Sequence, residues 1–215
     1  MEKKILNPNE ISPISVTVHK ELLGVVLCGG LSSRMGKDKG ILKIRGKHWA
    51  EHCREILMDF FGKVVLSINQ NQLVHYEKFF RIEDLVLDSF SVKGPLKGIF
   101  STHREYSQND LFILACDMIS MQSDAIALLL NAYKNHSGFD FYIFKNKGRI
   151  EPLCGIYTSN GLKKVELQFA ALRTDSHSVM NILENNKTFF LESDSNIESY
   201  FRNYNSPEDT KILEL

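Results

Sequence analysis

Short apolar segments alternate with longer amphipathic segments along most of this 215-residue chain. The apolar segments begin at about residue 22 and are partly β-branched, as expected of strands that are buried on both faces of a sheet. The predicted strands are Leu22–Leu27, Lys63–Asn69, Leu85–Asp88, Leu111–Cys116, Phe139–Lys145 and Pro152–Tyr157.

The amphipathic segments between these strands predict helices. In the third helix, Ile126, Leu129 and Leu130 form an apolar stripe, and Ser123 is the predicted N-cap. Strands that alternate with helices predict an α/β protein of the three-layer α/β/α type, with a mostly parallel, Rossmann-like sheet. The predicted helices are Trp49–Phe60, Leu96–Arg104, Ser123–Asn135, Ser159–Phe169 and Val179–Leu183.

No internal repeat, low-complexity tract or linker divides the chain. We therefore predict one domain over residues 22–215, in which the part after about residue 150 adds an edge that could hold a second substrate. Residues 1–21 do not share the pattern, and we predict that they form a mobile or loosely packed N-terminal extension.

The segment VVLCGGLSSRMGKDKGILK, residues 25–43, carries the first strand into a glycine-rich, basic loop. Gly29 and Gly30 allow backbone N–H groups to approach a ligand closely, and Arg34 and Lys39 add positive charge, so the loop predicts a polyphosphate site. It is not a Walker A loop, because its glycines are one residue too far apart. It is not the dinucleotide fingerprint either, because two of its glycines are adjacent.

Three further polar residues, Asn69, Asp88 and Asp117, end neighbouring predicted strands. Ligands of open α/β sheets bind beyond the carboxyl ends of the strands, so we expect these residues to share a rim with the glycine-rich loop. Asp117 directly follows a buried strand and suits Mg²⁺, which prefers one or two carboxylates together with phosphates and water. The alternative for Asp117 is a helix cap; a phosphate loop on the same rim favours the metal.

One other motif could indicate a different chemistry. His48, Glu51 and His52 form an H-x-x-E-H sequence, which is the inverzincin arrangement of a zinc protease. Because nothing else in the chain supports that chemistry, we expect these to be surface histidines or histidines with structural partners.

Composition limits the partners and the compartment. The 26 basic and 26 acidic residues cancel, which gives no general reason to expect nucleic-acid or membrane binding. No apolar run approaches the ~20 residues of a membrane span. The four cysteines include no C-x-x-C pair, which argues against a disulfide framework or a zinc site and suits a reducing cytosol. We expect a cytoplasmic protein without an export signal.

The glycine-rich loop resembles L-x-G-G-x-S-x-R-M-G-x-D-K, the signature of the molybdenum cofactor guanylyltransferases, or MobA-like proteins, which have a nucleotidyltransferase fold. The resemblance covers about residues 22 to 213, because later segments follow in the family's order at plausible spacings. The first motif is filled by Leu27, Gly29, Gly30, Ser32, Arg34, Met35, Gly36, Asp38 and Lys39. The later segments are Asp88 with Gly-Pro-Leu-x-Gly at 94–98, Cys116-Asp117-Met118, Glu151-Pro152-Leu153-Cys154-Gly155-Ile156-Tyr157 and Asn203-x-Asn205-Ser206-Pro207-Glu208-Asp209.

The resemblance implies a Mg²⁺-dependent transfer of a guanylyl group from GTP to the phosphate of molybdopterin or Mo-molybdopterin, with release of pyrophosphate. It also implies roles for individual residues in binding GTP. Leu27, Cys28, Gly29 and Gly30 would contact the nucleotide, Asn69 and Asp88 would hold the nucleoside, Lys39 would bind phosphate, and Asp117 would hold Mg²⁺ near the α-phosphate. Arg34 suits the β- and γ-phosphates because its planar fork matches phosphate oxygens, so Arg34, Lys39 and Asp117 are the implied catalytic residues.

By the same resemblance, Asn203 and Asn205 would face the pterin substrate or complete the metal shell. The alternative for these two residues is turn chemistry before a helix that Ser206 caps. The product would pass to molybdoenzyme apoproteins or their chaperones.

Other activities remain open at this point. Pterin cytidylyltransferases usually have Ala-Ala-Gly where this chain has Cys28-Gly29-Gly30, and glycine in the middle position leaves room for the larger purine. Cys28 itself departs from the usual alanine. Guanylyltransferases for cobinamide phosphate or small phosphorylated acids share the loop but match the later motifs less well. A non-catalytic nucleotide-binding or regulatory module on the same fold is the alternative of a different class.

Overall fold

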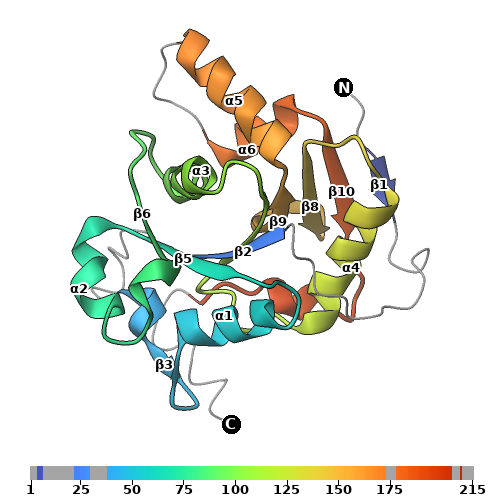
Figure 1. Cartoon of the computed structure of the whole chain (residues 1–215). Helices are drawn as coiled ribbons and strands as arrows, with labels where there is room; N and C mark the ends of the chain where they lie inside the picture. Colours follow the sequence, from blue (N-terminus) through green and yellow to red (C-terminus); the bar gives the residue numbers. More distant parts are fainter. Residues whose placement is uncertain (1–3, 7–21, 30–37, 173–177, 205–208, 210–215) are drawn as a thin grey trace.

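A mixed eight-stranded sheet forms the centre of the molecule, in the order β1-β10-β8-β9-β7-β2-β5-β6 (Figure 1). The coordinates are a computed structural model, which describes residues 4–6, 22–29, 38–172, 178–204 and 209. Every strand pairing in this sheet is parallel except those of β9, which runs antiparallel to both β7 and β8. The strands are β1 Lys4–Leu6, β2 Leu22–Leu27, β5 Val64–Ile68, β6 Leu85–Leu87, β7 Asp110–Ala115, β8 Phe141–Asn146, β9 Arg149–Tyr157 and β10 Thr188–Glu192.

Helices cover both faces of the sheet, with α1 and α4 on one side and α3, α5 and α6 on the other (Figure 1). The prediction of a three-layer α/β fold with a mostly parallel sheet is thereby confirmed. The helices are α1 Trp49–Met58, α2 Leu73–Tyr76, α3 Pro95–Glu105, α4 Ser123–Asn135, α5 Ser159–Leu172 and α6 Val179–Asn185. Smaller elements are the hairpin of β3 Lys43–Ile44 and β4 Lys47–His48, and the 3₁₀ turns η2 Lys39–Ile41, η3 Gln70–Gln72, η4 Ile82–Asp84 and η5 Glu198–Phe201.

The central strand β2 is buried on both faces, which explains its uninterrupted apolar sequence. Leu23 and Val25 pack in the cluster beneath α3 and α5, whereas Leu22 and Val26 pack in the cluster beneath α1 and α4. Within the described residues, no helix is long and apolar enough to cross a lipid bilayer.

The structure differs from the sequence predictions at the far edge of the sheet. Residues 4–6 form β1, which pairs in parallel with β10, although the sequence predicts that they belong to a loose extension. The rest of that extension, residues 1–3 and 7–21, lies outside the described residues. Strands β1 and β10 were not predicted, because two or three apolar residues in a row do not distinguish a strand from a helix end.

A second difference concerns the start of α4. Gln122 occupies the N-cap position and makes no side-chain capping hydrogen bond, while Ser123 is the first residue of the helix. The prediction that Ser123 is the cap is therefore wrong by one residue, which is the usual uncertainty at helix ends.

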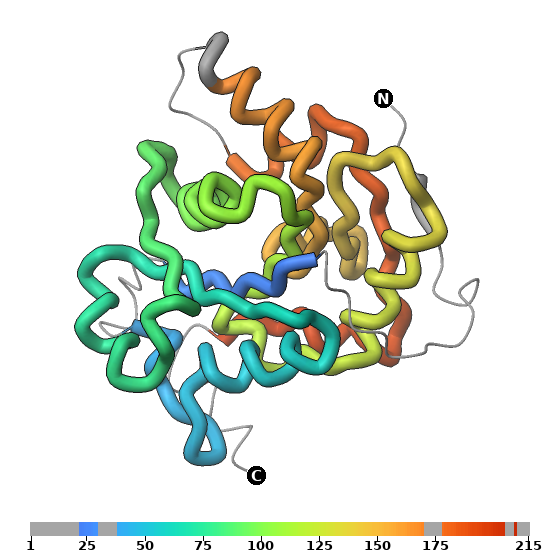
Figure 2. The backbone as a smooth tube through the Cα atoms, viewed as in Figure 1, coloured from blue at the N-terminus to red at the C-terminus, as the bar shows by residue number. Residues whose placement is uncertain are grey.

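The described segment of residues 198–204 returns toward the centre of the sheet (Figure 2). The η5 segment crosses the face covered by α1 and α4, where the Tyr200 hydroxyl donates to Asp124 at 3.3 Å. The backbone N–H of Tyr204 then reaches the backbone oxygen of Asp117 at 3.4 Å. The C-terminal segment thus borders the end of β7.

Candidate nucleotide-binding site

The carboxyl ends of β7, β2, β5 and β6 meet at one rim of the sheet, because these four neighbouring strands are parallel. Backbone hydrogen bonds extend past the strands and fix the rim. The N–H groups of Cys28 and Gly29 both donate to the Ser67 carbonyl, at 2.9 and 3.0 Å, and Cys116 N–H donates to the Leu27 carbonyl at 3.1 Å. The two described ends of the first loop lie at this rim with Asn69, Asp88 and Asp117, as predicted, while residues 30–37 of the loop lie outside the described residues.

These bonds limit how Cys28 and Gly29 can contact a nucleotide. Their N–H groups already donate to the Ser67 carbonyl. The backbone groups of this pair that remain for a ligand are therefore the carbonyl oxygens, which can accept a hydrogen bond. The Cys28 carbonyl also receives a bond from the Gln72 amide at 2.9 Å.

Lys39 and Asp117 come together across the rim. The Lys39 Nζ donates to Asp117 Oδ2 at 2.7 Å, and each of the two side chains is 18% exposed. Lys39 is the first residue of η2, whose N-cap is Asp38. The structure therefore joins two of the three predicted catalytic residues in one ion pair that is mostly, but not fully, shielded from solvent.

Asp38 fixes the end of the glycine-rich loop from which Lys39 projects. Its Oδ1 accepts from Gly40 N–H at 2.9 Å and from the Tyr76 hydroxyl at 3.1 Å, while its Oδ2 accepts from Gln72 Nε2 at 2.7 Å. Gly40 is required for this arrangement, because a Cβ there would lie 2.0 Å from the Tyr76 hydroxyl. The carboxylate is thus held by donors from three segments of the chain.

Asp88 lies against Gly29 on the other side of β2. A Cβ added to Gly29 would be 3.0 Å from Asp88 Oδ2, and Ser67 Oγ donates to Oδ1 at 3.3 Å. Burial raises the pKa of Asp88 above its ordinary value, and the charge of Lys97 and the bond from Ser67 partly offset this. The carboxylate is therefore partly desolvated, and a hydrogen-bond donor on a ligand would stabilise its charged form.

Asn69 lies at the rim as predicted but also serves its own 3₁₀ turn. Its Oδ1 accepts from Asn71 N–H at 3.0 Å, and its N–H donates to Gln72 Oε1 at 2.8 Å. A nucleoside contact from Asn69 would have to coexist with this reciprocal cap.

The remaining predicted residues are less informative. Asn203 is exposed beside the buried Tyr204, and Gly30, Arg34 and Asn205 lie outside the described residues. His52 has a structural partner, since its Nε2 lies 3.1 Å from the Ile119 carbonyl.

His48 is buried and its ring packs against Phe79, with ring centroids 4.2 Å apart. The prediction of structurally satisfied histidines is confirmed for both members of the H-x-x-E-H sequence.

Sequence reasoning did not assign roles to three residues at the site. Gln72 and Tyr76 contact the loop from η3 and α2, and no local pattern in the sequence indicates those contacts. Glu151 is near the start of β9, which runs antiparallel to β7. Because Cys154 pairs with Leu114 near the end of β7, Glu151 lies at the same rim. Burial raises the pKa of Glu151 to about 6, against the opposing effect of Arg149.

A pocket of about 510 Å³ lies between the β3–β4 hairpin, the segment that follows Asp117 and the C-terminal segment. We call it the basic pocket, because its lining includes Arg45, Lys47 and Arg202 and no carboxylate among the described residues. Lys47 is paired with Glu55 at 2.6 Å, and the Arg202 guanidinium lies 5.3 Å from the centre of the Tyr204 ring. The lining residues are Ile44, Arg45, Lys47, His52, Ile119, Ser120, Gln122, Ser199, Tyr200, Arg202 and Tyr204.

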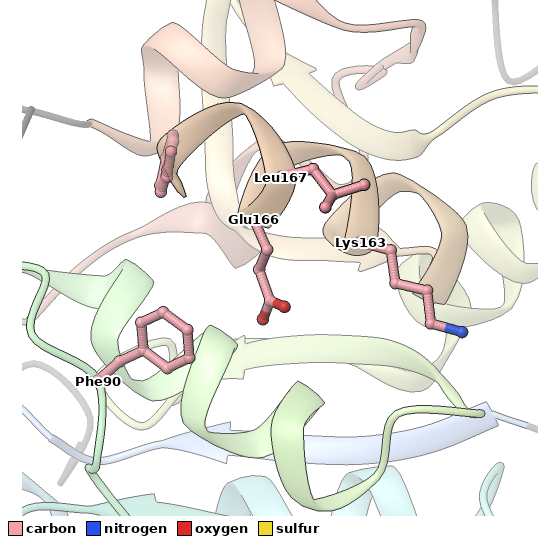
Figure 3. Close-up of a pocket in the computed structure, with 5 residues that line it drawn as sticks. Phe90, Lys163, Glu166 and Leu167 are labelled. Atoms are coloured by element: carbon pink, nitrogen blue, oxygen red, sulfur yellow. The ribbon is translucent and has the colours of Figure 1, made fainter. Parts of the chain in front are cut away.

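A different hollow of about 610 Å³ lies between α5 and the segment after β6 (Figure 3). Phe90 and Leu167 make its walls largely apolar, and Glu166 projects from α5 toward α3. Burial raises the pKa of Glu166, and Arg104 lowers it. Among the described residues that line it, Lys163 is the single cation, so this part of the hollow does not suit a polyphosphate.

Solved structures show the same fold. The molybdopterin-guanine dinucleotide biosynthesis protein A of Archaeoglobus fulgidus superimposes with a TM-score of 0.70 at 22% identity, covering 90% of this chain and 96% of that one. A cytidylyltransferase from Leptospira borgpetersenii superimposes with a TM-score of 0.67 at 17% identity, covering 91% of this chain and 86% of that one.

Sequence comparisons are more specific. A probable molybdenum cofactor guanylyltransferase of Geobacillus sp. is 31% identical over 194 residues, which cover 88% of this chain and 96% of that protein. A protein of the same description from Flavobacterium johnsoniae is 28% identical over 192 residues, covering 88% and 95%. The profile of the MobA-like NTP transferase domain matches residues 24–188. The chain therefore belongs to the MobA-like NTP transferase family and is a nucleotidyltransferase.

Proposed function

We propose that this protein transfers a guanylyl group from GTP to the phosphate of molybdopterin or Mo-molybdopterin and releases pyrophosphate, giving molybdopterin guanine dinucleotide. The observation that carries the proposal is the Lys39–Asp117 pair at the strand-end rim, with Gly29 and Asp88 beside it. The relatives described as probable molybdenum cofactor guanylyltransferases support the choice of substrates.

In this reaction an oxygen of the acceptor phosphate attacks the α-phosphorus of GTP, and the bond from that phosphorus to the β-phosphate oxygen breaks. The electron pair leaves with pyrophosphate. Because the attacking oxygen is already anionic, the reaction needs no strong general base. The protein must instead align the two phosphates and neutralise the charge that builds on the α-phosphate and the leaving group.

Lys39 is the described residue best placed to supply that charge. Its ammonium group is already directed to the rim by Asp117 at 2.7 Å. A phosphate that enters there competes with the Asp117 carboxylate for the three donors of the ammonium group. Arg34, which the family motif places in the same loop, would act on the β- and γ-phosphates.

The nucleoside would lie over Gly29 and against Asp88. The missing side chain at Gly29 leaves the Asp88 carboxylate accessible, and Ser67 fixes one of its oxygens at 3.3 Å. Asp88 can then accept a hydrogen bond from a hydroxyl or N–H group of the nucleoside. Carbonyl oxygens of Leu27, Cys28 and Gly29, with Gly30 and Asn69, would complete the contacts to GTP.

The residues at the rim fit Mg²⁺. Asp117 Oδ1 accepts no hydrogen bond within the described residues, so it can ligate a cation while Oδ2 bonds Lys39. No three His, Cys, Asp or Glu side chains converge in the described part of the chain, so such a cation would take its other ligands from phosphates and water, as Mg²⁺ commonly does. Bound there, Mg²⁺ would help to neutralise the charge on the α-phosphate.

The acceptor would occupy the rim on the side of the basic pocket. Its cations Arg45 and Arg202 suit an anionic substrate, and the rings of Tyr200 and Tyr204 suit a flat heterocycle. Asn203, which precedes Tyr204, and Asn205 would face the acceptor or the metal shell.

Pyrophosphate release with Mg²⁺ and molybdopterin tests the proposal when GTP, CTP and ATP are compared at equal concentrations. We expect turnover with GTP and little with the other two. A strong preference for CTP would overturn the base assignment, and nucleotide binding without turnover of any of the three would favour the regulatory alternative.

A further inference from the structure

We propose that Gln72 is a positioning residue for nucleotidyl transfer: its buried amide ties together the two ends of the glycine-rich loop and thereby holds Lys39 against Asp117. This inference rests on the function proposed above. The amide nitrogen of Gln72 donates two hydrogen bonds, one to each end of the loop.

Gln72 uses both N–H donors of its amide and its oxygen. Its Nε2 donates to the Cys28 carbonyl at 2.9 Å and to Asp38 Oδ2 at 2.7 Å, while its Oε1 accepts from Asn69 N–H at 2.8 Å. The side chain is almost buried, with 6% of the residue exposed. The reverse orientation of the amide would bring its oxygen against two other acceptors, so the contacts fix the orientation.

The two acceptors lie where the loop begins and where it ends. Cys28 follows β2 and is part of the expected nucleotide contact, whereas Asp38 caps η2 and immediately precedes Lys39. Through Gln72, the backbone at the start of the loop and the carboxylate at its end share one NH₂ group. A displacement at either end is therefore transmitted to the other.

The tie also determines where Lys39 projects. Gln72 donates to one oxygen of the Asp38 carboxylate, Oδ2, and the Tyr76 hydroxyl and the Gly40 N–H donate to the other, Oδ1. With Asp38 fixed, η2 starts in a set direction and the Lys39 ammonium reaches Asp117 at 2.7 Å. Without the NH₂ group of Gln72, the Cys28 carbonyl and the Asp38 carboxylate would both lose a hydrogen-bond donor, and these two acceptors would no longer be held together.

If Gln72 only stabilised the local fold, its acceptor bond would be the important one, because Oε1 accepts from the Asn69 N–H and completes the cap of η3. Gln72→Glu separates the two roles. Glutamate keeps the length of the side chain and an oxygen for the Asn69 N–H, but it replaces the NH₂ group by an acceptor facing Cys28 and Asp38. Gln70→Glu is the matched control, because Gln70 is exposed in the same 3₁₀ turn and gains the same charge.

The experiment measures pyrophosphate release under saturating GTP and molybdopterin, together with thermal unfolding. We expect Gln72→Glu to lower kcat about 10- to 100-fold, in proportion to the loss of one or two hydrogen bonds to charged or partly buried acceptors, and Gln70→Glu to stay within about twofold of the wild type. Equal kcat values for the two variants would overturn the inference.

The decisive readout is coupling to Lys39. If Gln72 acts by positioning Lys39, then Lys39→Ala should cost much less kcat in the Gln72→Glu background than in the wild type. Additive losses would mean that Gln72 affects turnover independently of Lys39, and they would overturn the inference even if kcat falls.

The double variant Asp38→Asn/Gln72→Glu provides a rescue and a safeguard against poor folding. It exchanges donor and acceptor across the 2.7 Å contact while retaining the volumes of both side chains. We expect it to recover part of the kcat lost by each single variant, and no recovery in a folded protein would count against the tie. Wild-type protein without turnover on any nucleotide would overturn the proposed function, whereas active wild type with uncoupled variants would overturn this inference alone.

Discussion

Replacing Lys39 by alanine should separate catalysis from stability. The substitution removes the cation that lies 2.7 Å from Asp117 Oδ2 and leaves the rest of the rim intact. The Asp38 anchor uses the backbone N–H of Gly40 and the side chains of Gln72 and Tyr76, so it does not depend on the Lys39 side chain.

The two effects differ in size. A group that neutralises charge developing in the transition state contributes about 3 kcal/mol, so Lys39→Ala should lower kcat on the order of 10²-fold. The lost ion pair is only partly shielded, with both side chains 18% exposed, so its contribution to the free energy of unfolding is about 1 kcal/mol. For a chain of 215 residues that corresponds to a Tm lower by about 2–4 °C.

The assay is pyrophosphate release at saturating GTP and acceptor, run beside differential scanning calorimetry. Lys164→Ala is the matched control, because Lys164 of α5 also donates to an aspartate, Asp140 Oδ1 at 2.5 Å, and Asp140 directly precedes β8, away from the carboxyl ends of the strands that form the rim. We expect that variant to lose stability and retain kcat. Lys39→Ala with more than a third of the wild-type kcat and an unchanged Tm would refute the assignment of Lys39.

Three further outcomes follow from the structure. Gly29→Ala places a Cβ 3.0 Å from Asp88 Oδ2, so calorimetric titration should show GTP affinity reduced about 5- to 10-fold with CTP affected less; an unchanged ratio of the two affinities would contradict the role of Gly29 in base choice. Glu151 has a folded-state pKa of about 6 against an ordinary 4.5, so its extra stabilisation is present below pH 4.5 and is lost as pH rises through 6. After discounting for partial exposure, urea titrations should show Glu151→Gln gaining about 1 kcal/mol on the wild type between pH 4.5 and pH 7.5, and parallel pH profiles would exclude the effect. Arg45→Ala or Arg202→Ala should raise the KM for the acceptor several-fold without changing GTP affinity, which initial-rate kinetics can check, and a selective change in GTP affinity would place the acceptor elsewhere.

The rim was predictable from sequence because topology alone determines it. Once β7, β2, β5 and β6 are parallel neighbours, the residues that follow them must lie at one edge. Asp88 and Asp117 follow two of those strands, so a one-dimensional pattern was sufficient to bring them together. The edge strand β1 and its neighbour β10 were missed, since each is short and depends on partners distant in sequence.

The support of the glycine-rich loop was not predictable in the same way. Gln72 and Tyr76 contact Asp38 across 34 and 38 positions of sequence, from a 3₁₀ turn and a one-turn helix whose placement follows from tertiary packing. The motif identified Asp38 as a member of the loop signature but gave it no partner. Such a contact becomes visible only when the buried polar groups and their donors are counted in three dimensions.

Ser67 shows why the nucleoside side of the site depends on the sheet more than on the loop. Its carbonyl receives the N–H groups of Cys28 and Gly29, while its hydroxyl donates to Asp88. Helix α3 closes over it, and a Cβ on Gly98 would lie 2.4 Å from the Ser67 hydroxyl, so only glycine allows this approach. The nucleoside contacts are therefore set by β5 and α3.

The phosphate contacts depend on Lys39, whose position is set by Asp38. These two halves belong to different segments, and the amide of Gln72 is the side chain that bonds to both. A substitution that breaks the amide bonds should therefore uncouple nucleotide affinity from turnover, whereas a substitution at Ser67 should weaken GTP affinity first.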